Sequence, residues 1–191
     1  MPTFNSTQLI DSLEQAVTQT IQAATALQQI NQDALCTAPS GKWSVIQILY
    51  HLNSYNDYYL PHIELAMRKN TIPYSATFKA GVIGNYFVNA MMPGNDGTVK
   101  NAMKAPKDHV AANGYNDTQA ISTFIDGQKK LLQLLKDARR VDLTKITVPI
   151  SISKLIKIRL GDTFRFLIAH QQRHFLQIKN TLKTNGVVLS V

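Results

Sequence analysis

The sequence has little cysteine, few acidic residues and no long apolar run. Cys36 is the only cysteine among 191 residues, so no internal disulfide can form, and a lone thiol suits a reducing cytoplasm. The apolar runs fall far short of the ~20 residues that span a bilayer, so we expect no membrane helix. Residues 1–5 lack a basic segment followed by an apolar one, so we expect no secretion signal and a cytoplasmic location.

Basic residues outnumber acidic ones, with 20 Lys and Arg against 12 Asp and Glu and a net charge of +8. Such an excess raises nucleic acid as a partner. The cations come singly or in pairs, such as Lys129-Lys130 and Arg139-Arg140, and neither a zinc-finger spacing nor an RNA-binding aromatic motif is present. We therefore expect no nucleic-acid partner, but a solvated basic surface that attracts anionic small molecules.

The length and a hydrophobic content of 45% predict one globular domain over residues 1–191, with residues 186–191 as a tail. Apolar residues recur at intervals of three and four, the period of a helical face, in four segments. These predict helices at about residues 6–30, 44–69, 118–140 and 162–183.

The helix ends carry recognisable signals. Ser6 or Thr7 can cap the first helix, Ser44 and Gln47 can form a capping box, and Asp162 can cap the fourth helix. Pro61 lacks an amide hydrogen, so it should kink or end the second helix, with a helical continuation to about residue 69.

The connections differ in length. Residues 71–116 are rich in proline and glycine and can cross the length of a bundle, with a short helix at 82–92 that turns Tyr86 and Phe87 inward. Residues 141–159 alternate apolar and polar side chains around Pro149, which predicts an extended connector or a short edge hairpin. The fold predicted is all-α: an up-down-down-up four-helix bundle with a long crossover between its second and third helices.

Two histidines, His170 and His174, stand four residues apart in the fourth predicted helix. At ~100° per residue they share one helical face, with Cβ atoms ~6 Å apart, so both can reach one metal ion. The alternative is that one ring packs in the core and the other is solvated. A metal site therefore needs a third ligand from elsewhere in the chain.

Three other histidines are available, His51, His62 and His109. His51 is the best candidate, because it borders the apolar face of a well-capped helix, whereas His109 lies in the long crossover. A core-edge histidine with a backbone partner is the other interpretation of His51.

The ordered combination Trp43-Ser44, His51-Leu52 and His170-x-x-Arg173-His174-x-x-Gln177-Ile178 resembles the DinB-like family, which includes the YfiT-like thiol transferases. The resemblance extends from the first helix to about residue 183. It implies a four-helix bundle and a divalent metal held by His51, His170 and His174. It also implies a homodimer.

Three neutral imidazoles suit zinc or nickel, and they leave a coordination position open. The resemblance implies metal-dependent transfer of a low-molecular-weight thiol to a small electrophile, with hydrolysis as a close variant. A non-catalytic stress-response module that binds metal or a small molecule is the alternative, and a metal-free polar cluster is the third. No phosphate-binding loop, dinucleotide fingerprint or nucleophilic serine elbow is present.

Four further residues lie beside the predicted ligands. Gln177 and Tyr55 can orient the ring nitrogens, and Tyr58 can line a pocket, although ordinary packing or solvation accounts for each as well. Arg173 can hold an anionic substrate group or pair with an acidic neighbour. Cys36 is far from the histidines in sequence, so we expect no catalytic thiol there.

Overall fold

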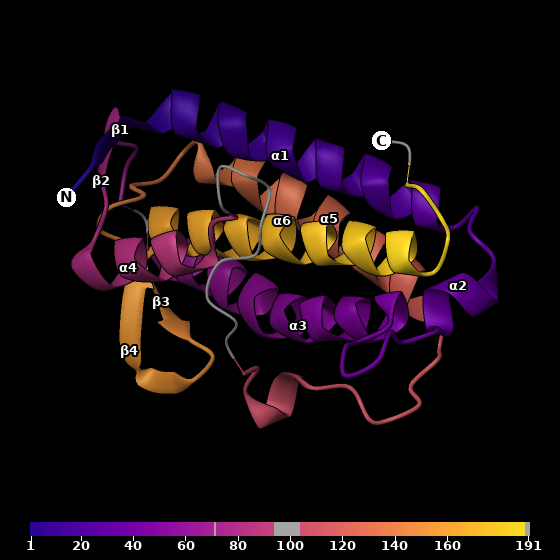
Figure 1. Cartoon of the computed structure of the whole chain (residues 1–191). Coiled ribbons are helices and arrows are strands. Elements are labelled where there is room, and N and C mark those ends of the chain that lie inside the picture. The colour runs from indigo at the N-terminus through magenta and orange to yellow at the C-terminus, as the bar shows by residue number, and fades with distance from the viewer. Residues whose placement is uncertain (71, 94–103, 190–191) are drawn as a thin grey trace.

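The computed structural model describes residues 1–70, 72–93 and 104–189. Four long helices dominate this part of the chain (Figure 1): α1 (Ser6–Leu27), α3 (Val45–Lys69), α5 (Gln119–Ala138) and α6 (Leu160–Thr184). Each lies within a few residues of a predicted helix. The chain is therefore mostly helical, as its apolar periodicity predicts.

The long helices pack side by side. Both α1 and α3 contact α5, and both contact α6, so α1 and α3 occupy opposite corners of the bundle. The contact between α3 and α6 brings the helix of His51 against the helix of His170 and His174. The up-down-down-up order stays a prediction, and residues 71 and 94–103 of the predicted crossover lie outside the described residues.

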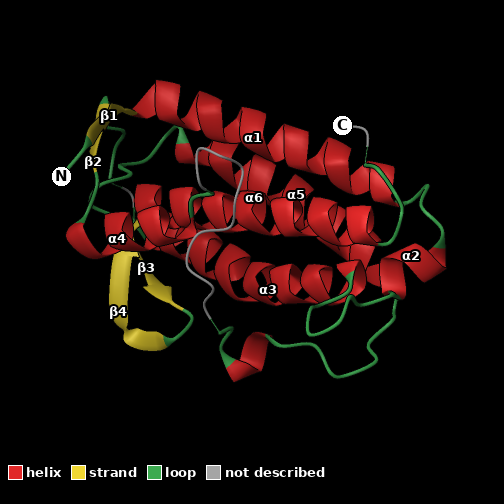
Figure 2. Cartoon of the chain, viewed as in Figure 1, coloured by secondary structure: helices red, strands yellow, loops and turns green. Residues whose placement is uncertain are grey.

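Shorter elements lie around the four long helices (Figure 2). These are α2 (Gln32–Cys36), α4 (Val82–Met91), the 3₁₀ turn η1 (Lys107–His109), the strand pair β1 (Thr3–Asn5) with β2 (Thr77–Lys79), and the hairpin β3 (Thr147–Ile150) with β4 (Ser153–Arg159). The hairpin confirms the alternation seen at 141–159. The pairing of β1 with β2 was not predicted, because three residues are too few to show a pattern.

Two predicted caps are wrong and one is confirmed. Ser44 and Gln47 form the capping box of α3. At α1 the cap is Asn5, whose side chain accepts from the amide of Gln8, while Ser6 lies buried in the first turn. Asp162 lies inside α6, and its carboxylate is drawn to a partner across the fold, the amide of Gly81.

The predicted helical continuation to about residue 69 is confirmed, because α3 runs through Pro61 to Lys69, and Pro61 therefore does not end the helix. Pro61 and Asp57 are both exposed, so the Asp57 carbonyl that loses its helical donor can be satisfied by water. Tyr86 does not turn inward but is 68% exposed, because α4 packs on α6 through its buried residue Gly84, while Phe87 is partly buried against the core.

The apolar core is divided into two clusters, one at each end of the bundle. One includes Tyr55 and Phe166, and the other includes Leu52 and Phe175. Buried polar side chains lie at the same level of α3, α5 and α6, between these clusters: His51, Asn56, Gln128, His170 and Gln171. Two of the three predicted metal ligands, His51 and His170, belong to this polar layer.

Candidate metal centre

The structure brings His51, His170 and His174 to a common point. The His170 Nε2 atom lies 3.1 Å from the Nε2 atom of His51 and 3.1 Å from that of His174. Among the described residues, these form a group whose potential ligand atoms all lie within 4.8 Å of one another. Helical spacing aligns the two rings of α6, and the packing of α3 on α6 supplies the third. We call this group the histidine cluster.

Hydrogen bonds made by Nδ1 determine which nitrogen faces the centre in two of the three rings. His51 Nδ1 donates to the backbone carbonyl of His109 at 2.8 Å, and His174 Nδ1 donates to the Gln177 side-chain oxygen at 2.9 Å. Each of these two rings, when neutral, therefore presents the lone pair of Nε2 to the centre. This is the usual way in which proteins orient a histidine that binds a metal.

Burial keeps the three rings neutral. His51 and His170 are 2% and 3% exposed, and His174 is half-buried. Burial, more than the neighbouring rings, lowers the pKa of His51 to about 4 and that of His174 to about 3. Burial also lowers the pKa of His170 well below its ordinary value, and the neighbouring rings lower it further. Neutral imidazole is the form that binds a metal ion.

The protons available do not satisfy the cluster by themselves. His170 Nε2 faces two lone pairs at 3.1 Å and can donate to only one of them. Its Nδ1 is buried and has no hydrogen-bond partner among the described residues. A cation at the centre would accept the lone pairs of all three Nε2 atoms, with the His170 proton then on its Nδ1. Tetrahedral zinc with Zn–N bonds of ~2.1 Å keeps its nitrogen ligands ~3.4 Å apart, which is close to the two distances of 3.1 Å from His170 Nε2.

Of the four residues predicted to lie beside the metal ligands, Gln177 and Tyr55 contact the histidine cluster directly. Gln177 contacts His174 as expected, and the Tyr55 ring lies 4.3 Å from the His170 ring, between their centroids. Tyr58 points elsewhere, since its hydroxyl donates to the Ile150 carbonyl of the hairpin. Arg173 is 6% exposed, and its charge contributes to the lowered pKa of His170 and of His174, after burial and the neighbouring rings.

Sequence reasoning missed how the chain outside the bundle supports His51. The carbonyl that holds its Nδ1 belongs to His109, and the Trp43 ring lies 5.2 Å from the His51 ring. Helical periodicity does not predict contacts with segments outside the helix. The position of a backbone carbonyl in an irregular segment cannot be predicted from the sequence, and His109 is a candidate there only as a metal ligand. His62 is not part of the cluster, and its Nδ1 donates to the Tyr58 carbonyl one turn before it.

Cys36 has no property of an activated thiol. Burial raises its pKa, and Asp33 raises it further. Its sulfur lies 3.7 Å from the carbonyl oxygen of Asn116, far along the chain from the histidine cluster. A raised pKa disfavours the reactive thiolate, and the absence of a catalytic role for Cys36 stays a prediction.

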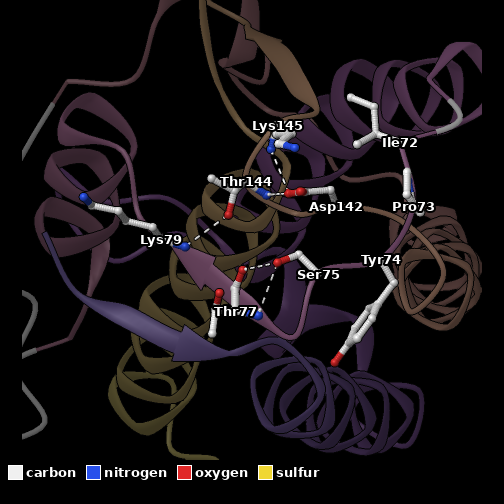
Figure 3. A pocket seen from close by; sticks show the side chains of 9 residues that line it. All are labelled: Ile72, Pro73, Tyr74, Ser75, Thr77, Lys79, Asp142, Thr144 and Lys145. Carbon is white, nitrogen blue, oxygen red and sulfur yellow. Dashed lines mark hydrogen bonds between the residues drawn. The ribbon is translucent and has the colours of Figure 1, made fainter.

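A separate cavity of about 400 Å³ lies where the segment before β2 meets the loop after α5 (Figure 3). Two hydrogen bonds join residues of its lining: Thr144 Oγ1 accepts from the amide of Lys79, and the Asp142 carboxylate accepts from the amide of Thr144. None of the three clustered histidines lines it. We interpret this cavity as a gap left where two loops pack against each other.

Comparison with protein-family models gives a match over most of the chain. A family model described as the DinB superfamily matches residues 12–178, which includes all three clustered histidines. Neither the curated proteins nor the solved structures contain a match. Within the described residues, every helix is too short or too polar to cross a membrane.

Proposed function

The chain belongs to the DinB superfamily, and from that premise we propose that it binds one divalent metal ion through His51, His170 and His174. The observation that carries the proposal is the convergence of three neutral imidazoles on one point, where at most one proton lies among the three facing Nε2 atoms. The outer hydrogen bonds of His51 and His174 support it, because they turn Nε2 inward in both rings.

Zinc and nickel are the ions we propose. A set of three imidazoles, without carboxylates or thiolates, suits borderline metals better than magnesium or calcium, which prefer oxygen ligands. When bound, such an ion supplies Lewis acidity at an open position, which lowers the pKa of a thiol or a water molecule.

For the activity, we propose metal-dependent S-transfer of a low-molecular-weight thiol to a small electrophile, with hydrolysis of a small molecule as the variant. His51 and His170 are buried and His174 is half-buried, so His174 and its partner Gln177 mark the side on which the cluster approaches solvent. The rings of Trp43 and Tyr55 cover His51 on other sides and exclude water.

A non-catalytic role is the alternative, in which the same site holds a metal or a small molecule within a stress-response module. The histidine cluster supports this equally, because the sequence names no general base beside the ligands. In either case we propose a cytoplasmic homodimer that acts without nucleic acid.

Turnover by the metal-loaded protein separates these functions. Protein loaded with zinc or nickel is mixed with a panel of thiols and a chromogenic electrophile, and separately with chromogenic esters and amides. His170→Ala should abolish turnover, whereas His62→Ala, a histidine on α3 outside the cluster, should retain it. Absence of turnover with every thiol, ester and metal, together with stoichiometric metal binding, would favour the non-catalytic module.

A further inference from the structure

Residues 104–116, which we call the strap, lie along α3 outside the bundle, beneath α3 in the view of Figure 1. The only regular element in the strap, all of which the structure describes, is the short turn η1. Most of its side chains are exposed, and only His109 and Ala111 are buried. A segment with so little buried surface is weakly held, so each of its contacts with α3 matters.

The strongest of these contacts is made to a proposed metal ligand. The His109 carbonyl accepts from His51 Nδ1 at 2.8 Å. The ring of the same residue anchors the carbonyl in place, because it lies 4.2 Å from the Tyr55 ring and its Nδ1 is 2.8 Å from the Ser54 hydroxyl. Since the Ser54 hydroxyl already donates to the His51 carbonyl, it accepts from His109.

The other contacts between the strap and α3 are weaker. Gln47 donates to the Ala112 carbonyl at the long distance of 3.4 Å, and the centroids of the Tyr115 and Tyr50 rings lie 4.8 Å apart. His109 is thus the main anchor of the strap, and its attachment point is the ring of His51.

We propose that metal binding and strap docking are coupled, with His109 as a positioning residue for the metal ligand His51. This rests on the proposed metal site. A docked strap holds the His51 ring with Nε2 turned toward His170, which favours the ion. An ion on Nε2 draws electron density from the ring and makes its Nδ1–H a stronger donor to the His109 carbonyl. Because coupling is reciprocal, the strap raises metal affinity by the factor by which metal favours docking.

The other oriented ligand provides a matched comparison. Gln177, which holds His174 Nδ1, lies on the same helix as its ligand and does not belong to the strap. Loss of Gln177 should weaken metal binding without affecting the strap, whereas loss of the His109 ring should affect both. Contacts of this kind change metal affinity by ~10–100-fold in metalloproteins.

Hydrogen exchange of the wild-type chain, with and without saturating zinc, is the first measurement. The amides of His109 and Val110 are hydrogen-bonded within η1, so they report whether the strap is ordered. Zinc should slow their exchange by about tenfold or more, in keeping with the reciprocal factor. Amides of the β3–β4 hairpin, which bears none of the clustered histidines, should exchange at unchanged rates.

Zinc affinity is then measured by competition with a chromogenic chelator. His109→Ala should raise the Kd about tenfold and abolish the effect of zinc on exchange in the strap. Gln177→Ala should also raise the Kd about tenfold, but saturating zinc should still slow hydrogen exchange in the strap of this variant. Circular dichroism of each variant verifies that the bundle is folded, and the wild-type exchange experiment needs no variant.

The outcomes separate the two proposals. If wild-type protein binds no zinc or nickel, the proposed metal site fails and the coupling fails with it. If metal binds but strap exchange is the same with and without it, the metal site stands and the coupling is refuted. An unchanged Kd in folded His109→Ala would refute the positioning role in the same way.

Discussion

The metal-free protein is expected to lose stability as the pH falls below ~6.5, the pKa of histidine in an unfolded chain. Burial lowers the pKa of His51 to about 4, so the unfolded chain takes up a proton in this range that the folded chain does not. The contribution of His51 to stability is therefore complete above ~pH 6.5 and is lost as the pH falls toward 4.

The size of the effect follows from the lowered pKa. A decrease from ~6.5 to about 4 corresponds to ~3 kcal/mol, of which ~2 kcal/mol is lost by pH 5. His51 is 2% exposed, so solvent screening gives no reason to reduce this figure. His170 and His174 act in the same direction, but their contributions cannot be summed because the rings titrate together. A loss of ~2 kcal/mol is a large part of a typical stability of ~5–15 kcal/mol.

Urea unfolding followed by circular dichroism, at pH 7.5 and pH 5 in the presence of a chelator, measures this loss. The wild type should lose ~2 kcal/mol or more between the two pH values. His51→Leu should lose clearly less, and His62→Leu, on the same helix but outside the cluster, should behave as the wild type. Equal stability of the wild type at both pH values would refute the burial of neutral imidazoles.

Three further predictions concern residues outside the histidine cluster. Gly84→Ala should destabilise by ~1–3 kcal/mol in thermal unfolding, since its Cβ would lie 2.5 Å from Asp162 Cβ, whereas Val82→Ala on the exposed face should be nearly neutral. Asp162→Ala should cost ~3 kcal/mol or more, because the buried carboxylate pairs with Arg165 at 3.0 Å; a melting temperature like that of the wild type would contradict this. Cys36→Ser should leave the Kd for zinc unchanged, and a large increase would return the thiol to consideration.

The sequence predicts best what local geometry decides. The four long helices follow from apolar periodicity, and the capping box of Ser44 and Gln47 follows from their spacing. The alignment of His170, His174 and Gln177 on one face of α6 is also local, since three- and four-residue spacing fixes it. These features required no knowledge of other parts of the chain.

The features that the sequence did not predict depend on contacts between distant segments of the chain. Asp162 is a good capping residue by type, yet the Gly81 amide and Arg165 take its carboxylate. Tyr86 is apolar enough to be buried, but the close approach of α4 to α6 at Gly84 turns it outward. The placement of His51 beside the α6 pair was predicted from its position on a well-capped helix and from the resemblance. A backbone partner for His51 was the other interpretation, but the sequence does not indicate that this partner is the carbonyl of His109.

The most direct measurement is the metal content of protein purified without an affinity tag, combined with zinc titration of the chelator-treated chain. The account predicts one divalent ion per chain, with binding lost in His170→Ala and retained in His62→Ala. A wild-type chain that takes up neither zinc nor nickel, or a His170→Ala variant that binds as tightly as the wild type, would contradict it.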